Sequence, residues 1–452
     1  MTTDWLLALI PMILLLIISI IVRSQCESWI HPSAYFLLVV MLYFLPPLVF
    51  AYNTYIWPGA MWWILASALA FLSGSMILTF SHGSKSINNT CAGFPDIDIN
   101  SDQAKDEVLG ISQFPRIELV LIVSIVLGVL SSILLLVFYG KGVDVYRSLQ
   151  GIVGVGSESS ILRYSSNYRP PLINQAMLTF AYVSPMLGGI IMALRENKKH
   201  LALSLLSFLP SLLTFLTETT KAAILFSFIL FISGYFASQV LVGRSNNYRL
   251  FSRNRLPIFL AIILISLIIL SFGDIARKGQ IPTISEMIKA ARSSRASATV
   301  FGHAPAFSLW FQRAWAGNEE LTFGAGTFGG VYDFFGIKEK VNVNPEAENF
   351  YISGDKVTNI ISIFGVLASD FSLAGSLLFL FIFGLVASIS YFKVGKGSLM
   401  LMPLLIAVYA FMSMQLTSIF KYSTVIMAIL VIQAYIISIR IFQRRAQPQD
   451  AS

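Results

Sequence analysis

The sequence contains very little cysteine. Cys26 and Cys91 are the only two cysteines among 452 residues, and they do not form a CxxC pair. Both fall in segments that we expect on the cytoplasmic side of a membrane, which excludes a disulfide framework and a cysteine-based metal site. No acidic pair in the predicted external loops has metal-ligand spacing either, so we expect no metal, no cofactor and no redox chemistry.

Charge is also scarce. Only 12% of the residues are charged and 56% are hydrophobic, and the mean hydropathy is +0.74. A soluble core cannot hide that much apolar surface, so the chain is predicted to be an integral membrane protein. The net charge of +8 does not indicate nucleic-acid binding, because the cations sit in short loops between apolar runs and not along a continuous groove. Membrane topology and an anionic substrate explain them better.

Eleven apolar segments are long enough to cross a bilayer, which needs roughly 17 to 25 residues per helix. Their approximate bounds are 5–22, 34–52, 59–80, 117–139, 172–194, 201–217, 222–242, 256–273, 372–393, 399–414 and 424–442. Pro46, Pro47 and Pro210 fall inside two of them, and membrane helices tolerate proline. The predicted fold is an all-α polytopic membrane protein with about eleven spans, within a range of ten to twelve.

The first apolar run, from Trp5 to Val22, has no basic residue before it and Arg23 directly after it. A cleaved signal peptide normally begins with a positively charged region. The run is therefore interpreted as a retained helix whose N-terminus lies outside the cell.

Orientation follows from four short basic segments that fall on one face of the eleven-span arrangement. They contain Arg195, Lys198 and Lys199; Arg244, Arg249, Arg253 and Arg255; Lys393 and Lys396; and Arg440, Arg444 and Arg445. Short loops rich in Lys and Arg stay in the cytoplasm. That leaves two larger external loops, 140–171 and 274–371, the second partly helical, and places the acidic linker 81–115 inside, where we assign it no catalytic role.

The second external loop opens with a basic segment from residue 277 to residue 313. It contains Arg277, Lys278, Lys289, Arg292, Arg295 and Arg313, with Glu286 as its single acid. The first external loop adds Arg163 and Arg169. Cations kept outside against the topological bias indicate an anionic ligand, and a lipid diphosphate at head-group depth would fit. The alternative is ordinary solvated or snorkelling charge that anchors helix ends.

Residues 284–298 have the pattern of an amphipathic helix, with Glu286, Lys289, Arg292 and Arg295 in one polar sector. Such a helix either caps a substrate cavity or simply lies on the membrane surface. Lys221 belongs to the short turn 217–221 between two spans, where a charge is costly unless it is wet, paired or functional. Lys221 would meet a phosphate or neutralise Glu218.

His303, in Phe301-Gly-His303-Ala-Pro305, is the only histidine expected on the outer face. Its ordinary pKa near neutrality suits a general base or a proton donor to a leaving phosphate. A single histidine beside aromatic residues more often has a structural role. We predict a catalytic role for His303, Arg277 and Arg292.

Two features of the large loop have two interpretations each. Gly324-Ala-Gly326-Thr-Phe-Gly329 matches the dinucleotide-binding fingerprint, but no βαβ unit surrounds it, so these glycines more plausibly permit tight turns or close backbone approach. The loop aromatics would stack on sugar faces, or would pack the loop and form an interfacial belt. They are Trp310, Phe311, Trp315, Phe323, Phe328, Tyr332, Phe334 and Phe335.

The stretch Asn359-Ile-Ile-Ser-Ile-Phe-Gly365-Val-Leu-Ala-Ser-Asp370-Phe371-Ser-Leu-Ala-Gly375, followed by Phe383-Gly384-Leu385, resembles the O-antigen and oligosaccharide repeat-unit polymerases, the Wzy-like family. Members of that family commonly show an Asn-rich entry, an Asp-Phe-Gly-like stretch and a glycine ahead of a late span. Ser372 stands where the family usually has the glycine. Thr217-Glu-Thr-Thr-Lys221 and Arg277-Lys278-Gly279 agree with the family in outline.

The resemblance implies transfer of a growing glycan from undecaprenyl diphosphate onto a new lipid-linked repeat unit, at the periplasmic face of a bacterial inner membrane. It also implies a chain-length regulator as a partner. Under this interpretation the diphosphates of the two lipid-linked oligosaccharides are bound by basic residues. These are Arg163, Arg169, Lys221, Lys278, Lys289, Arg295 and Arg313.

Two alternatives remain at this point. A ligase that joins O-antigen to the lipid A core would have similar spans and one large basic loop. A transporter or flippase of lipid-linked anionic sugars would place ionisable residues near the bilayer midplane and often shows two related halves. In this chain the clear charges crowd the external loops and no internal repeat is apparent, which favours the enzyme.

Overall fold

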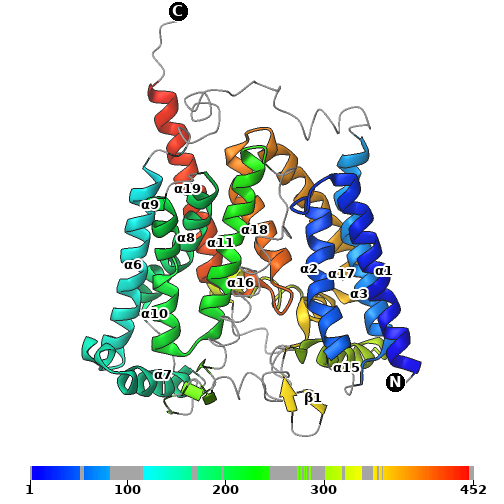
Figure 1. Cartoon of the computed structure of the whole chain (residues 1–452), viewed down its shortest axis with the longest axis horizontal. Coiled ribbons are helices and arrows are strands. Elements are labelled where there is room, and N and C mark those ends of the chain that lie inside the picture. Colours follow the sequence, from blue (N-terminus) through cyan, green and yellow to red (C-terminus); the bar gives the residue numbers. More distant parts are fainter. Residues whose placement is uncertain are drawn as a thin grey trace, which may run out of the picture.

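A computed structural model shows the chain as an upright bundle of helices with one small strand pair (Figure 1). The structure describes residues 3–50, 55–81, 114, 116–163, 171–194, 198–244, 272, 273, 275, 276, 279, 281, 283, 285, 286, 301–317, 321–337, 350–353, 356–358 and 360–446. Within these residues nine helices are long and apolar enough to cross a membrane. The all-helical, polytopic class predicted from the sequence is therefore confirmed.

The nine candidate spans follow the predicted segments closely. They are Asp4–Cys26, Pro32–Val49, Pro58–Thr79, Ile117–Phe138, Leu172–Leu194, Lys198–Glu218, Lys221–Leu241, Ser362–Gly395 and Ser423–Ile441. The predicted span 256–273 lies outside the described residues except for its last two positions. The predicted span 399–414 corresponds to a shorter apolar helix, Leu399–Ser413.

The helices form two groups with one helix between them (Figure 1). The first group contains α1 (Thr3–Cys26), α2 (Pro32–Phe50), α3 (Pro58–Ser81) and α17 (Ser362–Gly395). The second contains α6 (Ile117–Phe138), α8 (Leu172–Leu194), α9 (Lys198–Leu206), α10 (Leu209–Glu218) and α11 (Lys221–Leu241), with α19 (Ser423–Ala446) against α8. Helix α18 (Met402–Ser413) contacts α2, α11, α17 and α19.

Each group is held by one pair of helices in backbone contact. A Cβ atom added at Gly74 of α3 would overlap the Phe381 carbonyl, and one at Gly384 of α17 would overlap the Phe71 carbonyl. Gly189 of α8 and Gly234 of α11 make the same reciprocal approach in the second group. Because lipid gives helices no hydrophobic reason to associate, small residues that allow close van der Waals packing stabilise such pairs.

Serine and threonine hydroxyls add hydrogen bonds between these helices. The Ser33 and Ser75 hydroxyls lie 2.7 Å apart between α2 and α3, and Ser388 of α17 donates to the Ser75 carbonyl. In the second group the Ser184 hydroxyl donates to the Ser207 carbonyl at 2.9 Å. Each bond satisfies a polar group that would be costly in an apolar interior.

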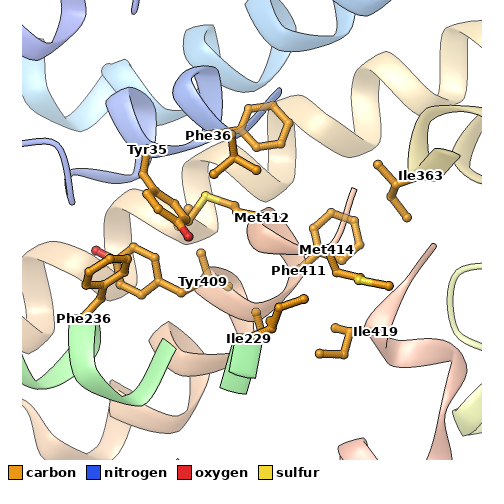
Figure 2. Packing of buried hydrophobic residues seen from close by; sticks show 14 of the residues in the cluster. Tyr35, Phe36, Ile229, Phe236, Ile363, Tyr409, Phe411, Met412, Met414 and Ile419 are labelled. Atoms are coloured by element: carbon orange, nitrogen blue, oxygen red, sulfur yellow. The ribbon is translucent and has the colours of Figure 1, made fainter. Parts of the chain in front are cut away.

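Helix α18 is buried except at Leu404, which is 38% exposed. Its residues Tyr409, Phe411 and Met412 are at most 1% exposed, and Figure 2 shows them packed with Tyr35 and Phe36 of α2 and Ile229 and Phe236 of α11. A helix that is apolar all round is stable only when neighbours enclose it. With twelve residues, α18 spans about 18 Å at 1.5 Å per residue, well short of a bilayer core.

Three of the predicted spans have a different form from that expected. The segment 201–217 is not one helix, because α9 and α10 are separated at Ser207 and Phe208 and Pro210 lies in the first turn of α10. Proline has no N–H and cannot continue a preceding helix without losing a bond, so it favours a new start. The segment 399–414 is too short to cross, as described above. Helix α17 begins ten residues before the predicted 372–393 and contains a kink at Ser372.

The predicted external loops supply short elements to one end of the bundle, the lower end in Figure 1. These are η1 (Val143–Arg147), α7 (Leu149–Arg163), α15 (His303–Trp315) and the antiparallel strands β1 (Phe350–Ser353) and β2 (Lys356–Thr358), paired as Phe350 with Thr358. The C-terminal end of α19 lies at the opposite, upper end, as does the junction of α8 and α9. Helix α16 (Gly329–Phe334) lies further inside the bundle.

Candidate functional site

Helix α7 packs against the turn between α10 and α11 at the lower end of the second group. The Ser159 hydroxyl donates to the Thr217 carbonyl at 2.7 Å, and the Thr219 hydroxyl donates to the Gly156 carbonyl at 3.2 Å. A Cβ atom added at Gly156 would lie 2.5 Å from the Thr219 methyl group, so a glycine is required there. The first external loop and the 217–221 turn are thus one packed unit.

The turn itself brings a carboxylate and an ammonium to the same place. Thr219 has φ 52°, which ends α10 in the left-handed region, and Thr220 is extended, so α11 starts at Lys221. The Thr220 hydroxyl donates to Glu218 Oε2 at 3.0 Å. Both Glu218 and Lys221 are half-buried, which for charges at the end of a membrane helix means access to water or to a polar ligand.

The start of the second external loop lies against this unit. A Cβ atom at Gly273 would be 3.5 Å from Lys221 Cε, and the rings of Phe272 and Phe215 are 5.9 Å apart. Further along, a Cβ atom at Gly279 would be 3.8 Å from Ser157 Oγ of α7. The structure therefore brings together three segments that the sequence singled out separately. We call α7, the 217–221 turn and the described residues of 272–279 the basic corner.

Six of the predicted site residues lie outside the described residues. They are Arg169, Arg277, Lys278, Lys289, Arg292 and Arg295. Arg163 is the last residue of α7. Of the predicted helix 284–298 only residues 285 and 286 are described, and both are helical.

The described start of that helix has a capping box. Glu286 Oε2 accepts from the Thr283 amide at 2.8 Å and from its hydroxyl at 2.8 Å, while the Glu286 amide donates to Thr283 Oγ1 at 3.2 Å. A threonine and a glutamate three residues apart satisfy each other's backbone donors in this way at a helix N-terminus. The single acid of the basic segment therefore serves to start a helix.

Two ion pairs join described surface charges of the predicted first external loop. Lys141 Nζ lies 2.9 Å from Glu158 Oε2, and Arg147 lies 3.1 Å from Asp144. The side chains of Arg147 and Asp144 are 83% and 71% exposed. Exposed pairs of this kind contribute at most about 1 kcal/mol, so they neither fix the loop nor compete strongly with a ligand.

His303 and Arg313 belong to a different place, on α15 beneath α2, α3 and α17 (Figure 1). His303 is 3% exposed, its Nε2 donates to the Tyr43 carbonyl at 2.9 Å, and its ring lies 5.4 Å from that of Phe44. The Arg313 guanidinium sits 5.0 Å from the centre of the Phe350 ring. This packing supports a structural role for both, and their predicted catalytic and substrate-binding roles stay predictions.

The structure also shows a site around Asp370, which lies in the stretch that carries the resemblance but was not among the predicted site residues. This side chain is 1% exposed, and its carboxylate accepts from the Gly326 amide at 2.9 Å, the Thr327 amide at 2.5 Å and the Thr322 hydroxyl. A buried carboxylate is tolerated only when hydrogen bonds replace its hydration. The glycine-rich loop of residues 322–330 folds around it to supply them.

Two glycines of that loop make close backbone approaches, and the sequence predicts this for Gly326. A Cβ atom at Gly326 would lie 2.8 Å from Val366 and 3.2 Å from Asp370 Oδ1. A Cβ atom at Gly330 would lie 2.6 Å from the Ser423 amide nitrogen. Neither position has room for a side chain, so the loop can enter the helix packing only as glycine.

A break in α17 allows Asp370 to face the loop. Ser372 has φ 68° and ψ 172° inside the helix, a conformation almost restricted to glycine. Its hydroxyl accepts from the Gly375 amide at 3.2 Å and so caps the second half of the helix. Ser372 stands where the family that the sequence resembles usually has a glycine. The backbone conformation at this position is the one that glycine adopts most easily.

The connection between α18 and α19 completes this arrangement. The Ser418 hydroxyl donates to the Thr327 carbonyl at 2.7 Å, and the Ile363 amide donates to the Gln415 carbonyl at 2.9 Å. Irregular backbone inside a membrane protein occurs where protein encloses it or where it lines a wet cavity. We call residues 322–330, Asp370 with Ser372, and 414–422 the aspartate hub.

Lys421 lies at the edge of the aspartate hub and was not singled out from the sequence. It is half-buried at the end of η5 (Ile419–Lys421), and a Cβ atom at Gly329 would lie 3.4 Å from its Cγ. Its position between two apolar segments near the C-terminus could have indicated a functional residue, since charges at such positions are rare without a function.

The loop aromatics divide into two sets. Trp310 and Phe311 are 1% exposed, and Phe328 stacks on Phe420 with ring centres 6.1 Å apart. By contrast Trp315, Phe323, Phe334 and Phe335 are 61%, 74%, 64% and 68% exposed. The packing interpretation holds for the first set, and the second remains available for lipid or ligand.

Among the described residues, no group of three His, Cys, Asp or Glu side chains is placed to hold a metal ion. Comparisons with protein-family models, curated proteins and solved structures found no match. The function must therefore be argued from the sites themselves.

Proposed function

We propose that this protein polymerises lipid-linked oligosaccharide repeat units of the O-antigen type. It transfers the growing glycan from undecaprenyl diphosphate to a new lipid-linked repeat unit at the periplasmic face of a bacterial inner membrane. The proposal combines the resemblance around Asp370 with the arrangement of the basic corner.

The basic corner is the observation that carries the proposal. Gly273 and Gly279 flank the segment that contains Arg277 and Lys278, and they lie against Lys221 and α7 respectively. The described residues on either side of Arg277 and Lys278 therefore lie near Lys221 and α7, which supports the proposal that these two cations act together with Lys221 at a helix end. Cations at head-group depth suit a lipid diphosphate, whose prenyl chain stays in the bilayer while its phosphates reach the interface.

The finer topology is part of the proposal. Eleven spans, with 256–273 as the eighth, would place the short basic loops in the cytoplasm and loops 140–171 and 274–371 in the periplasm. The nine described candidate spans and the shared lower end of η1, α7 and α15 support this orientation.

A diphosphate leaving group needs cations more than it needs a general acid. An acceptor hydroxyl attacks the anomeric carbon and gives up its proton to a carboxylate or histidine that acts as general base. The bond from that carbon to the diphosphate oxygen breaks, and the leaving undecaprenyl diphosphate takes the electron pair. Cations fixed beside that oxygen stabilise the developing charge in the transition state. Arg277 and Arg292 are the residues we propose for this role, with Lys221 and Lys278 holding the diphosphate.

The direct experiment deletes the gene in the producing strain and examines its surface glycan on a gel. Loss of polymerase leaves a single repeat on the lipid core, whereas loss of a ligase or flippase removes all repeats. A normal glycan ladder would exclude all three activities.

One structural observation favours the transporter alternative. One predicted span is divided into two helices, α9 and α10, and α17 is kinked beside the buried Asp370 carboxylate. Discontinuous helices of this kind are typical of transporter binding sites. However, the Asp370 carboxylate bonds to the protein's own amides. Purified protein in lipid vesicles separates the two: elongation of lipid-linked glycan supports the polymerase, and movement of that glycan across the bilayer without elongation supports the transporter.

A further inference from the structure

Phe323 is held in a costly conformation that exposes its ring. Its φ is 49°, in the left-handed region, and the following Gly324 has φ 88°. An aromatic residue with positive φ costs on the order of 1 to 2 kcal/mol relative to ordinary backbone. The side chain is 74% exposed, so packing within the protein does not offset this cost.

Hydrogen bonds on both sides fix this conformation. Before it, the Thr322 amide donates to the Ser369 carbonyl at 3.0 Å, and the Thr322 hydroxyl donates to Asp370. After it, the Phe323 carbonyl accepts from the Tyr332 hydroxyl at 2.8 Å. The aspartate hub therefore fixes the backbone from which the Phe323 side chain projects.

The ring does not contribute to the aromatic packing nearby. Phe328 and Phe371 stack on Phe420 and Phe379 respectively. Within the described residues Phe323 has no aromatic ring contact of this kind. A strained backbone that presents an exposed ring at a fixed position is more consistent with recognition than with packing.

We propose that Phe323 is a stacking platform for a pyranose ring of the lipid-linked oligosaccharide, with Asp370 and Tyr332 as its positioning residues. This inference rests on the proposed function and names a sugar-binding residue for it. A pyranose has a flat apolar C–H face that matches a single ring of fixed orientation while its hydroxyls stay solvated. A prenyl chain is flexible and would need an apolar groove instead.

The variants Phe323→Ala, Phe323→Gly and Phe323→Trp test the platform, with Phe335→Ala as a matched control. Phe335 is 68% exposed with φ −87°, so it has similar exposure without the strain. We expect Phe323→Ala and Phe323→Gly to raise the KM for lipid-linked oligosaccharide about tenfold, which corresponds to about 1.4 kcal/mol of binding. Phe323→Trp and Phe335→Ala should stay within twofold of wild type.

The melting temperature of Phe323→Gly distinguishes a binding role from a structural role for Phe323. Phe323→Gly relieves the left-handed strain, so its melting temperature in detergent should be equal to or above that of wild type while its sugar affinity falls. A melting temperature well below wild type for Phe323→Gly would indicate a packing residue and overturn the proposal.

A binding measurement separates this inference from the proposed function. The probes are lipid-linked single repeats extracted from the deletion strain and undecaprenyl diphosphate without sugar. We expect Phe323→Ala to weaken binding of the first about tenfold and to leave the second unchanged. Equal weakening of both, wild-type affinity for the first, or no binding of the first by the wild-type protein would overturn it.

Two outcomes then distinguish the claims. If wild-type protein binds the glycan in a Phe323-dependent manner but does not elongate it, the polymerase proposal fails and the platform stands. If wild-type protein elongates the glycan and Phe323→Ala does so with the same KM, only the platform fails.

Discussion

The aspartate hub and the basic corner both contain charge inside a membrane protein, but they use it differently. In the hub, Asp370 is 1% exposed and its carboxylate accepts three hydrogen bonds from the glycine-rich loop. In the corner, Lys221 and Glu218 are half-buried at the ends of two helices. The hub charge is enclosed and bonded to backbone, which favours a fixed structure, whereas a partly wet charge can exchange water for a ligand.

The difference separates residues that position from residues that bind. A change that removes a hydrogen bond of the hub should lower stability first and activity as a consequence. A change in the corner should lower activity while the protein remains folded. The following predictions test that division, beginning with the largest expected effect.

Replacing Asp370 by Ala should destabilise the protein most. It leaves the Gly326 and Thr327 amides without their acceptor, and each unsatisfied buried donor costs roughly 1 to 3 kcal/mol. We expect a total loss of about 3 kcal/mol or more, seen as a lower melting temperature and a reduced monodisperse fraction in detergent. Asp144→Ala, at a 71% exposed side chain, is the control and should melt like wild type. Unchanged melting of the Asp370 variant would show that the hub does not stabilise the fold.

Replacing Arg277 by Ala should reduce polymerisation more than tenfold at unchanged membrane abundance. A guanidinium binds a phosphate through two parallel hydrogen bonds and an ammonium cannot, so Arg277→Lys should recover only part of the activity. Glycan ladders and quantitative blots measure both. Full recovery by lysine would show that charge alone matters, and wild-type ladders in Arg277→Ala would remove it from the mechanism. Arg292→Ala is expected to behave like Arg277→Ala.

Replacing Lys221 by Ala should reduce transfer about tenfold, with little change in melting temperature. The comparison is Lys141→Ala, which removes a lysine paired with Glu158 in the first loop, and this variant should retain at least half of the activity. Elongation by purified protein at matched concentrations gives the result. If Lys221→Ala melts far below wild type and its activity loss follows that melting, Lys221 acts by pairing and not by binding.

The smallest effect is expected at Ser372. Gly should be more stable than Ser because it adopts φ 68° without strain, whereas Ala keeps the strain and loses the hydroxyl that accepts from the Gly375 amide. We expect Ser372→Gly to gain up to about 1 kcal/mol and Ser372→Ala to lose about as much. Melting temperatures should follow the order Gly, Ser, Ala. Any order with Ala above Ser would show that the hydroxyl makes no useful cap.

Local sequence signals predicted part of the sites correctly. The glycines of 324–329 were expected to allow close backbone approach, and Gly326 does so against Asp370. A helix was predicted from residue 284, and the bonds between Thr283 and Glu286 form the capping box at the start of a helix there. The partners of Asp370 were not predictable, because Thr322 and Asp370 are 48 positions apart in the chain and no local periodicity encodes such a contact.

The position of α15 was likewise beyond local reasoning. His303 and Arg313 were grouped with the other external cations because they follow them in the sequence. In the structure α15 packs under α2, α3 and α17, 260 positions separate His303 from its acceptor Tyr43, and Lys221 lies with the other helix group. Neighbourhood in sequence is a poor guide to neighbourhood in space for residues of a long loop.

The sequence by itself determined the class of this protein and most of its helices, because the free energy of placing about twenty apolar residues in a bilayer depends on composition and length alone. It also marked Ser372 and the 217–221 turn through their residue types. Only the tertiary structure decided that α9 and α10 are separate, that α18 is too short to cross, that Asp370 holds the glycine-rich loop and that Phe323 is presented on it. These depend on which backbone groups find partners across the fold, and burial makes that pairing obligatory without making it local.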